Sequence, residues 1–313
     1  MVKSPPIGIA FALGCLVILG VMPLLSNTRP AGSDGLVFAL CVTAWQLIAA
    51  LPLSVAEFVR GRRVRLVAAD PAGRKRIAAI ALATGAMFGV TTYLYVAAAQ
   101  RAGAVSLGIA LQAYPLFAML LEAVFLGKRK SAREIGLTVL MVAALVYLIT
   151  GGTFRPATIS WWSVLALGIP LLWSIAHLLL KPVLERASIT PNQVTVSRLL
   201  ISGACLLLFQ AGFGTGGALT AALTDLDVQK AAALLGIAYY VELVLWFYAM
   251  RHIDVSLASS VTVPAPAVTM LVAVALLGQE VQRYQLLAMA VVTASLYGLL
   301  LGQKRARRLA PAG

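Results

Sequence analysis

The sequence predicts an all-α integral membrane protein in which ten transmembrane helices form two inverted five-helix repeats. The first observation is composition, since 61% of the 313 residues are hydrophobic and only 12% are charged. Soluble domains carry roughly 25% charged residues, so a soluble protein of this composition would lack a polar surface. The second is spacing, because the apolar residues fall in blocks of about twenty, which match the ~30 Å hydrocarbon core of a bilayer at ~1.5 Å per helical residue. The third is a similarity between the two halves of the chain.

Ten apolar blocks, bounded by charged residues, glycine or proline, predict the ten spans. In chain order the predicted spans are 7–25, 36–59, 77–99, 103–126, 132–151, 160–182, 193–213, 230–250, 254–277 and 283–302. The first block follows "MVKSPP" directly but continues to about Leu25, so we interpret it as a span and not as a cleaved signal. Barrel strands are not expected, because the blocks are about twice as long as such strands and lack strict alternation.

Lysine and arginine residues are distributed unequally between alternate connections of these spans. The connections on the side of both termini carry 19 of the 25 basic residues, the opposite connections carry 5, and Arg198 lies inside a span. Cytoplasmic connections of membrane proteins are enriched in lysine and arginine. We therefore predict a multi-pass protein of the cell (inner) membrane with both termini cytoplasmic.

The internal similarity is clearest between two stretches of 27 and 28 residues. The stretch "RAGAVSLGIALQAYPLFAMLLEAVFLG" at 101–127 aligns with "RHIDVSLASSVTVPAPAVTMLVAVALLG" at 251–278. The informative matches are Arg101 with Arg251, Pro115 with Pro266, Gly127 with Gly278, and "VSL" at 105–107 with "VSL" at 255–257. Each unit contains five spans, which is an odd number, so the two units must have opposite orientations in the membrane. Secondary transporters that bind solute near the midplane have such inverted repeats. We expect these units at 1–152 and 158–303, followed by a basic cytoplasmic tail at 304–313.

One order of features occurs twice, at 92–150 and at 243–302. A helix ends in a short polar loop, a span with a central proline follows, then "LG" with polar residues, then another span. This order resembles the EamA-like branch of the drug/metabolite transporter superfamily. The resemblance implies a ten-helix carrier of small metabolites, often an exporter, with no bound cofactor. Members commonly carry a glutamate directly after "LG"; here "LGK" lacks it, and "LGQE" has it one place later, as Glu280.

Glu242 is the most informative single residue, because it lies near the middle of the eighth predicted span. A charge at the centre of a membrane helix costs at least ~2.5 kcal/mol on insertion scales, so such residues are functional hypotheses by default. Tyr239 and Trp246 share its helix face. A carboxylate between two aromatic side chains suits a cavity wall that binds an organic cation or amine. It also suits a proton carrier, and the alternative without a function in transport is a glutamate that only holds helices together.

Two further spans contribute candidate residues for the same site, and Gln46 of a third is considered below. Trp173 and His177 are separated by four residues in the sixth span, so they share one face, and His177 could exchange a proton with Glu242. The alternative for His177 is a hydrogen bond to a backbone carbonyl or a serine. Gln112 stands just before Pro115 in the fourth span. Tyr114 lies nearly opposite Gln112 on a helical wheel, so the two are not expected to face one cavity.

The other polar residues of the spans have plainer interpretations. Gln46, in the second span, can hydrogen-bond either the substrate or a neighbouring helix. Arg198 lies about two turns into the seventh span, where we expect it to pair with Glu122 or Glu185. The three cysteines lie inside apolar blocks without metal-ligand spacing, and no phosphate-binding loop motif occurs. Neither an enzyme nor a metal site is therefore expected, and the basic residues form no nucleic-acid face.

The sequence thus predicts a secondary transporter, more often an exporter in this family, of small organic metabolites such as amino acids or amine-bearing compounds. Its expected partners are a small-molecule substrate and the lipid bilayer, with no nucleic acid, no cofactor, and a monomeric or homodimeric state. Two alternatives remain open. One is a proton-coupled importer of a small metabolite, and the other is a membrane interaction or lipid-handling protein without a solute cavity.

Overall fold

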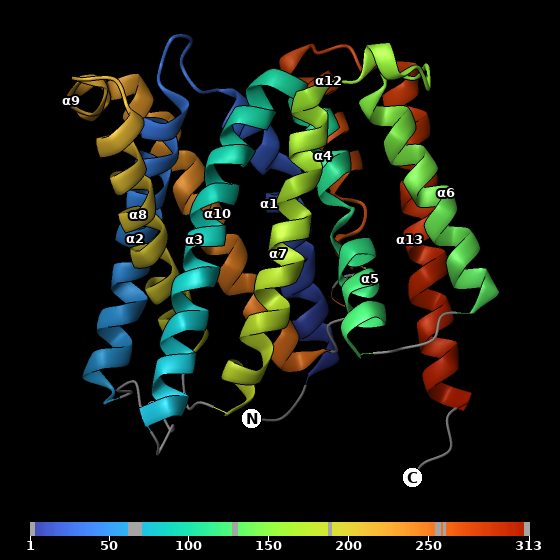
Figure 1. Ribbon diagram of the computed structural model, residues 1–313, viewed down its shortest axis with the longest axis horizontal. Helices are drawn as coiled ribbons and strands as arrows, with labels where there is room; N and C mark the ends of the chain where they lie inside the picture. The colour runs from blue at the N-terminus through green and yellow to red at the C-terminus, as the bar shows by residue number, and fades with distance from the viewer. Residues whose placement is uncertain are drawn as a thin grey trace.

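The computed structural model is a bundle of helices that lie side by side (Figure 1). It describes residues 4–61, 71–126, 131–186, 190–253, 258 and 261–309. The first half of the chain forms α1 Pro5–Asn27, α2 Gly35–Val59, α3 Pro71–Ala102, α4 Ala104–Leu111, α5 Tyr114–Leu126 and α6 Ala132–Ile149. The second half forms the short 3₁₀ helix Pro156–Thr158, then α7 Trp161–Arg186, α8 Pro191–Phe213, α9 Ala218–Thr224, α10 Leu226–His252, α12 Ala265–Leu277 and α13 Arg283–Leu309. All regular structure in the described ranges is helical, as predicted.

Eight of these helices are long and apolar enough to cross a membrane, within the part of the chain that the structure describes. They correspond to the predicted spans other than the fourth and the ninth. Those two contain shorter apolar helices, at Ala104–Phe117 and Ala265–Leu277. Residues 254–257 and 259–260 of the predicted ninth span lie outside the described residues. The all-helical membrane architecture is confirmed, and the number of ten spans stays a prediction.

The fourth span is interrupted by a turn at Gln112 and Ala113, between α4 and α5. The cause is Pro115, which has no N–H to donate to the carbonyl of Leu111 and whose ring disfavours helical geometry before it. A second turn, at Val263 and Pro264, directly precedes α12 and stands in the same relation to Pro266. The two turns therefore occupy equivalent places in the repeated stretches.

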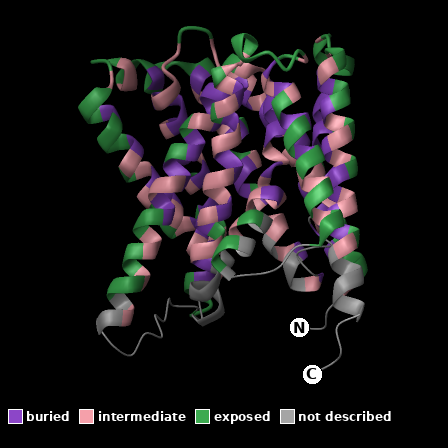
Figure 2. Ribbon diagram, turned by 45° about the vertical axis from the view of Figure 1, so that its right-hand side comes forward, coloured by how far each residue is buried: buried purple, intermediate pink, exposed green. Residues whose placement is uncertain are grey.

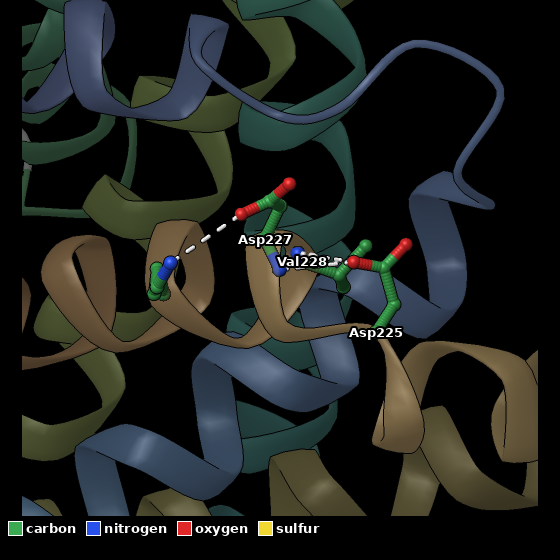
Figure 3. Close-up of polar contacts among 4 residues, drawn as sticks. Asp225, Asp227 and Val228 are labelled. Atoms are coloured by element: carbon green, nitrogen blue, oxygen red, sulfur yellow. Dashed lines mark hydrogen bonds and ion pairs between the residues drawn. The ribbon is translucent and has the colours of Figure 1, made fainter.

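Helix starts follow from local capping chemistry. The Asp34 side chain accepts hydrogen bonds from the backbone N–H groups of Leu36 and Val37 at the start of α2. Ser131 with Glu134, and Thr190 with Gln193, form capping boxes that begin α6 and α8. Asp225 accepts from the backbone N–H groups of Asp227 and Val228 at the start of α10, as Figure 3 shows. Asp227 also lies 3.6 Å from the amine of Lys230, one turn further along α10.

Two large clusters of buried apolar side chains hold the helices together. One includes Phe38 of α2, Tyr95 of α3 and Leu235 of α10. The other joins α4, α6, α12 and α13 through residues such as Ile109, Leu145 and Leu296. Each cluster combines residues from both halves of the chain, so the halves share their cores. Figure 2 shows the buried residues where helices face one another, with exposed residues on their outward faces and at the ends.

The outward faces carry large apolar side chains, as contact with lipid requires. Val59, Val124 and Phe213 are 76–80% exposed. Soluble monomers rarely expose apolar surface so widely. The exposed residues and the spans therefore agree on a multi-pass membrane protein.

Candidate functional site

A central cavity of about 160 Å³ lies between the two halves of the chain. Its walls come from α1, α3, α4 and α5 of the first half, and from α7, α8, α10 and α12 of the second. Both interrupted segments reach it, through Gln112 and Val263. Irregular backbone inside a membrane protein is tolerated where it is covered by protein or lines a cavity, which is the situation here.

Six of the seven predicted site residues line the central cavity. They are Glu242, Tyr239 and Trp246 of α10, Trp173 and His177 of α7, and Gln112 of the turn between α4 and α5. Helical spacing correctly placed the three residues of α10 on one face. The structure therefore brings together side chains that come from three different predicted spans.

Gln46 does not line the cavity. It is 1% exposed on α2, and its backbone nitrogen lies beside Gly236 of α10. Its Oε1 is buried without a hydrogen-bond partner in the described ranges. Of the two interpretations of Gln46, the structure places it against the neighbouring helix.

Glu242 is only 7% exposed and faces the cavity from the middle of α10. Its backbone carbonyl accepts a hydrogen bond from the Cys15 thiol of α1, at 3.5 Å. Among the described residues, its carboxylate forms neither a hydrogen bond nor an ion pair. The alternative of a glutamate that joins helices through a salt bridge therefore finds no partner in the described part of the chain.

His177 and Trp173 are each fixed by a neighbouring helix. The Tyr114 hydroxyl of α5 lies 2.9 Å from Nδ1 of His177, so within the described ranges this histidine contacts a tyrosine hydroxyl and no carbonyl or serine. The Trp173 indole N–H donates to Oγ1 of Thr91 on α3, at 3.1 Å. Each of these two side chains is therefore held at one polar atom by a neighbouring helix while it lines the cavity.

The expectation that Gln112 and Tyr114 cannot face one cavity is wrong. Both residues line it. The helical wheel assumed a continuous helix, whereas the turn at Gln112 and Ala113 rotates the following residues to a new direction. The proline at 115 was the available signal for this break.

Arg198 is the charged cavity residue that the sequence interpretation assigned to a structural ion pair and did not place at the site. It lines the central cavity from α8, and its guanidinium carbon lies 4.1 Å from the ring centroid of Phe88. The side chains of Glu122 and Glu185 lie outside the described residues, and Arg198 forms no ion pair or hydrogen bond in the described part. The available signal was its charge inside an apolar span, which is itself a reason to expect function.

A second polar cluster fixes the helices that carry Arg198 and Glu242. The Asn192 amide of α8 donates to Ser54 and Glu57 of α2, each at 3.1 Å. Its carbonyl oxygen accepts from the Tyr240 hydroxyl of α10, at 2.9 Å. Asn192 thereby joins α2, α8 and α10 at one point. Glu57 is 8% exposed, so this carboxylate is buried together with its partner.

Metal ligation finds no support in the described ranges, where no group of three or more histidine, cysteine, aspartate or glutamate side chains is close enough to hold an ion. The chemistry of the cavity is instead that of solute binding. It combines one carboxylate, one guanidinium, one imidazole and several aromatic rings.

Comparison with known proteins identifies the family. The model of the EamA-like transporter family matches residues 6–150 and again 160–301. No curated protein matches the chain. A solved structure titled "Crystal structure of protein" is 19% identical, with 98% of this chain and 99% of that chain covered and a TM-score of 0.57, which supports the fold alone. Because the family model matches most of the sequence in two consecutive copies, the chain belongs to the EamA-like transporter family, within the drug/metabolite transporter superfamily.

Proposed function

We propose that this protein is a secondary transporter that moves a small organic metabolite across the cell (inner) membrane by alternating access. The observation that carries the proposal is the central cavity, where Glu242, Tyr239, Trp246, Trp173, His177 and Gln112 meet between the two halves. An acidic group among aromatic rings suits an amine-bearing solute such as an amino acid. The resemblance noted for the sequence favours export as the direction.

The proposed architecture is ten spans in two inverted repeats, at 1–152 and 158–303, with a basic tail at 304–313. It counts α4 with α5 as one interrupted span, and the described part of 254–277, which includes α12, as another. In Figure 1, α5 ends near the end of the bundle where both chain termini lie, whereas α12 ends near the opposite one. Opposite directions of these equivalent segments support an inverted relation.

The proposal is tested by thermal-shift measurements of the purified protein against a metabolite library, followed by transport in proteoliposomes. A solute that binds only the folded state raises the melting temperature in proportion to occupancy. We expect amine-bearing solutes to stabilise the wild type. In Glu242→Gln, loss of one charge-assisted hydrogen bond weakens their affinity by about tenfold or more.

Glu280→Gln is the matched control, because it makes the same chemical change at an exposed position between α12 and α13. It should leave both binding and transport unchanged. Failure of every solute to stabilise the protein would contradict the proposal, as would equal binding by Glu242→Gln and wild type. Cysteines at 239 and 246 that resist aqueous thiol reagents from both sides would instead favour a membrane interaction or lipid-handling protein.

Proton-coupled import is the second candidate, favoured by the presence of two titratable side chains, Glu242 and His177, in one cavity. It requires solute movement to follow an imposed pH gradient across the proteoliposome membrane. In that case Glu242→Gln should abolish gradient-driven accumulation. Solute exchange that is indifferent to the gradient would eliminate this candidate.

A further inference from the structure

The central cavity contains two opposite formal charges, one acidic and one basic. Glu242 extends from α10 and Arg198 from α8. We infer that the solute is a zwitterion, whose anionic group binds Arg198 and whose cationic group binds Glu242. This inference rests on the proposed function and adds to it the charge pattern that the substrate must carry.

Arg198 has hydrogen-bonding capacity that the described residues leave unused. Its guanidinium is covered on one side by the ring of Phe88, at 4.1 Å, and its Nε is buried without a partner in the described residues. Cation–π contact attracts the guanidinium but provides no hydrogen-bond acceptor. A guanidinium presents a planar set of donors that matches a carboxylate. An anionic group of the solute would therefore supply the missing acceptor.

Within the described part of the chain, the carboxylate of Glu242 lacks a hydrogen-bond donor and a positive charge beside it, in the same way that Arg198 lacks an acceptor. Glu242 is 7% exposed, and its carboxylate accepts no hydrogen bond from any described residue. A buried, unpaired carboxylate is costly unless another group compensates it. An ammonium group of the solute would provide both the charge and the donors.

Arg198 and Glu242 attract each other across the cavity, but no ion pair within 4.0 Å joins them in the described structure, so neither supplies the other's hydrogen-bond partner. Both nevertheless border one cavity, so a single molecule can reach both of them. A solute with only a cation would leave Arg198 unpaired, and a solute with only an anion would leave Glu242 unpaired. A zwitterion is the class of solute that pairs both at once.

The dimensions and walls of the cavity define the rest of the solute. A volume of about 160 Å³ is on the order of ten times the ~10–15 Å³ that one buried water requires. This space fits a molecule on the order of ten non-hydrogen atoms. The rings of Trp173, Trp246 and Tyr95 also line the cavity, so the body between the two charges is expected to be apolar.

The test uses probes that share one apolar body and differ only in charge. One set is L-leucine, 3-methylbutylamine and 4-methylpentanoate, and the other is L-phenylalanine, 2-phenylethylamine and 3-phenylpropanoate. Binding of each to the purified wild-type protein is measured by thermal shift and calorimetry, together with every solute found in the metabolite screen. We expect each zwitterion that binds to have an affinity about tenfold or more higher than that of its amine or its acid, because loss of one charge-assisted hydrogen bond lowers affinity by at least that factor.

Two variants test which residue binds which charge of the solute. In Arg198→Gln, the affinity for the zwitterion should fall to the wild-type affinity for its amine, and the affinity for the amine should be unchanged; Arg198→Lys should restore part of the loss. In Glu242→Gln, the affinity for the zwitterion should fall to the wild-type affinity for its acid. Arg283→Gln, at an exposed position at the start of α13, is the matched control and should bind like the wild type.

The outcomes distinguish this inference from the proposed function. Binding of singly charged solutes alone, or equal binding of an amine and its zwitterion, would overturn the inference and leave transport intact. If no solute binds, the proposed function fails and the inference fails with it. Zwitterion binding without transport in proteoliposomes would uphold the inference and contradict the proposed function. The wild-type comparison decides the matter even if Arg198→Gln does not fold.

Discussion

At the scale of single residues, the indole of Trp173 depends on an acceptor from another helix. Its N–H donates to Oγ1 of Thr91, whose side chain is 1% exposed. Thr91 and its neighbour Thr92 both donate their hydroxyl protons to the backbone carbonyl of Phe88. Only Thr91 forms the bond to Trp173, so the two adjacent threonines differ in one contact to the cavity wall.

Replacing Thr91 by valine should therefore destabilise the protein more than replacing Thr92 by valine. Each change removes one bond to Phe88, but Thr91→Val also leaves the half-buried Trp173 N–H without this acceptor. We expect a difference in the free energy of unfolding of about 1–3 kcal/mol. Chemical denaturation of the two purified variants measures it. Equal destabilisation would show that the indole does not depend on Thr91.

The residue scale also shows what a sequence can and cannot reveal about the site. Glu242 was identifiable because a lone carboxylate in an apolar helix is costly, and helical periodicity then placed Tyr239 and Trp246 beside it. Arg198 was assigned to a different environment, because its distance along α8 from the cytoplasmic end suggested a local salt bridge. Its approach to Phe88 and the cavity follows from tertiary packing, which no spacing along one helix encodes.

At the scale of helices, α10 and α2 approach closely at Gly236 of α10. A Cβ atom at this position would lie 2.7 Å from the carbonyl oxygen of Val42 and 2.8 Å from Cβ of Trp45, both on α2. The first contact is with backbone, which cannot move aside without shifting the helix. Small residues permit such approach between membrane helices.

Gly236→Ala should therefore be destabilising, by about 1–3 kcal/mol as for other overpacked positions. Gly136→Ala is the matched control in α6, because no atom lies within 4 Å of the Cβ it would add. Alanine is the better helix former, so the control should be neutral or stabilising by up to about 1 kcal/mol. Thermal unfolding in detergent compares the two variants. A Gly236→Ala protein as stable as the wild type would refute the close packing of α2 and α10.

Most helices could be located from the sequence to within a few residues, since blocks of apolar residues report burial in lipid directly. The eighth predicted span, 230–250, corresponds to α10 at Leu226–His252, and the second, 36–59, to α2 at Gly35–Val59. The short helix α9 was missed, because seven residues of mixed polarity in a connection carry no hydropathy signal. The turns in the fourth and ninth spans were missed as well, because hydropathy averages across them.

At the scale of the whole molecule, the start of α1 and the end of α13 lie at one end of the bundle (Figure 1). By sequence, 19 of the 25 lysine and arginine residues belong to the predicted connections on the side of the termini. The positive-inside rule therefore predicts that this end faces the cytoplasm. The connection between α6 and α7 lies at the opposite end and should face away from the cytoplasm.

Single cysteines test this orientation in a background from which Cys15, Cys41 and Cys205 have been removed. Ala157→Cys lies in the exposed connection after α6, and Ala132→Cys lies at the exposed start of α6. A membrane-impermeant maleimide should label position 157 in intact cells and position 132 only after lysis, because the bilayer separates them. The reverse pattern would invert the assigned orientation.

The paired interruptions, at residues 112–113 and 263–264, have a mechanical consequence. An uninterrupted transmembrane helix moves as one rigid body, so a movement that opens one side of the protein would also disturb the packing on the other side. Two shorter helical arms joined by a turn, which acts as a pivot, can tilt separately. Because α4 contacts α12 where Gly108 meets Thr269, the two pivots sit close together near the centre of the molecule. In the proposed alternating-access transport, tilting of one arm would open the cavity on that arm's side while the other side stays closed.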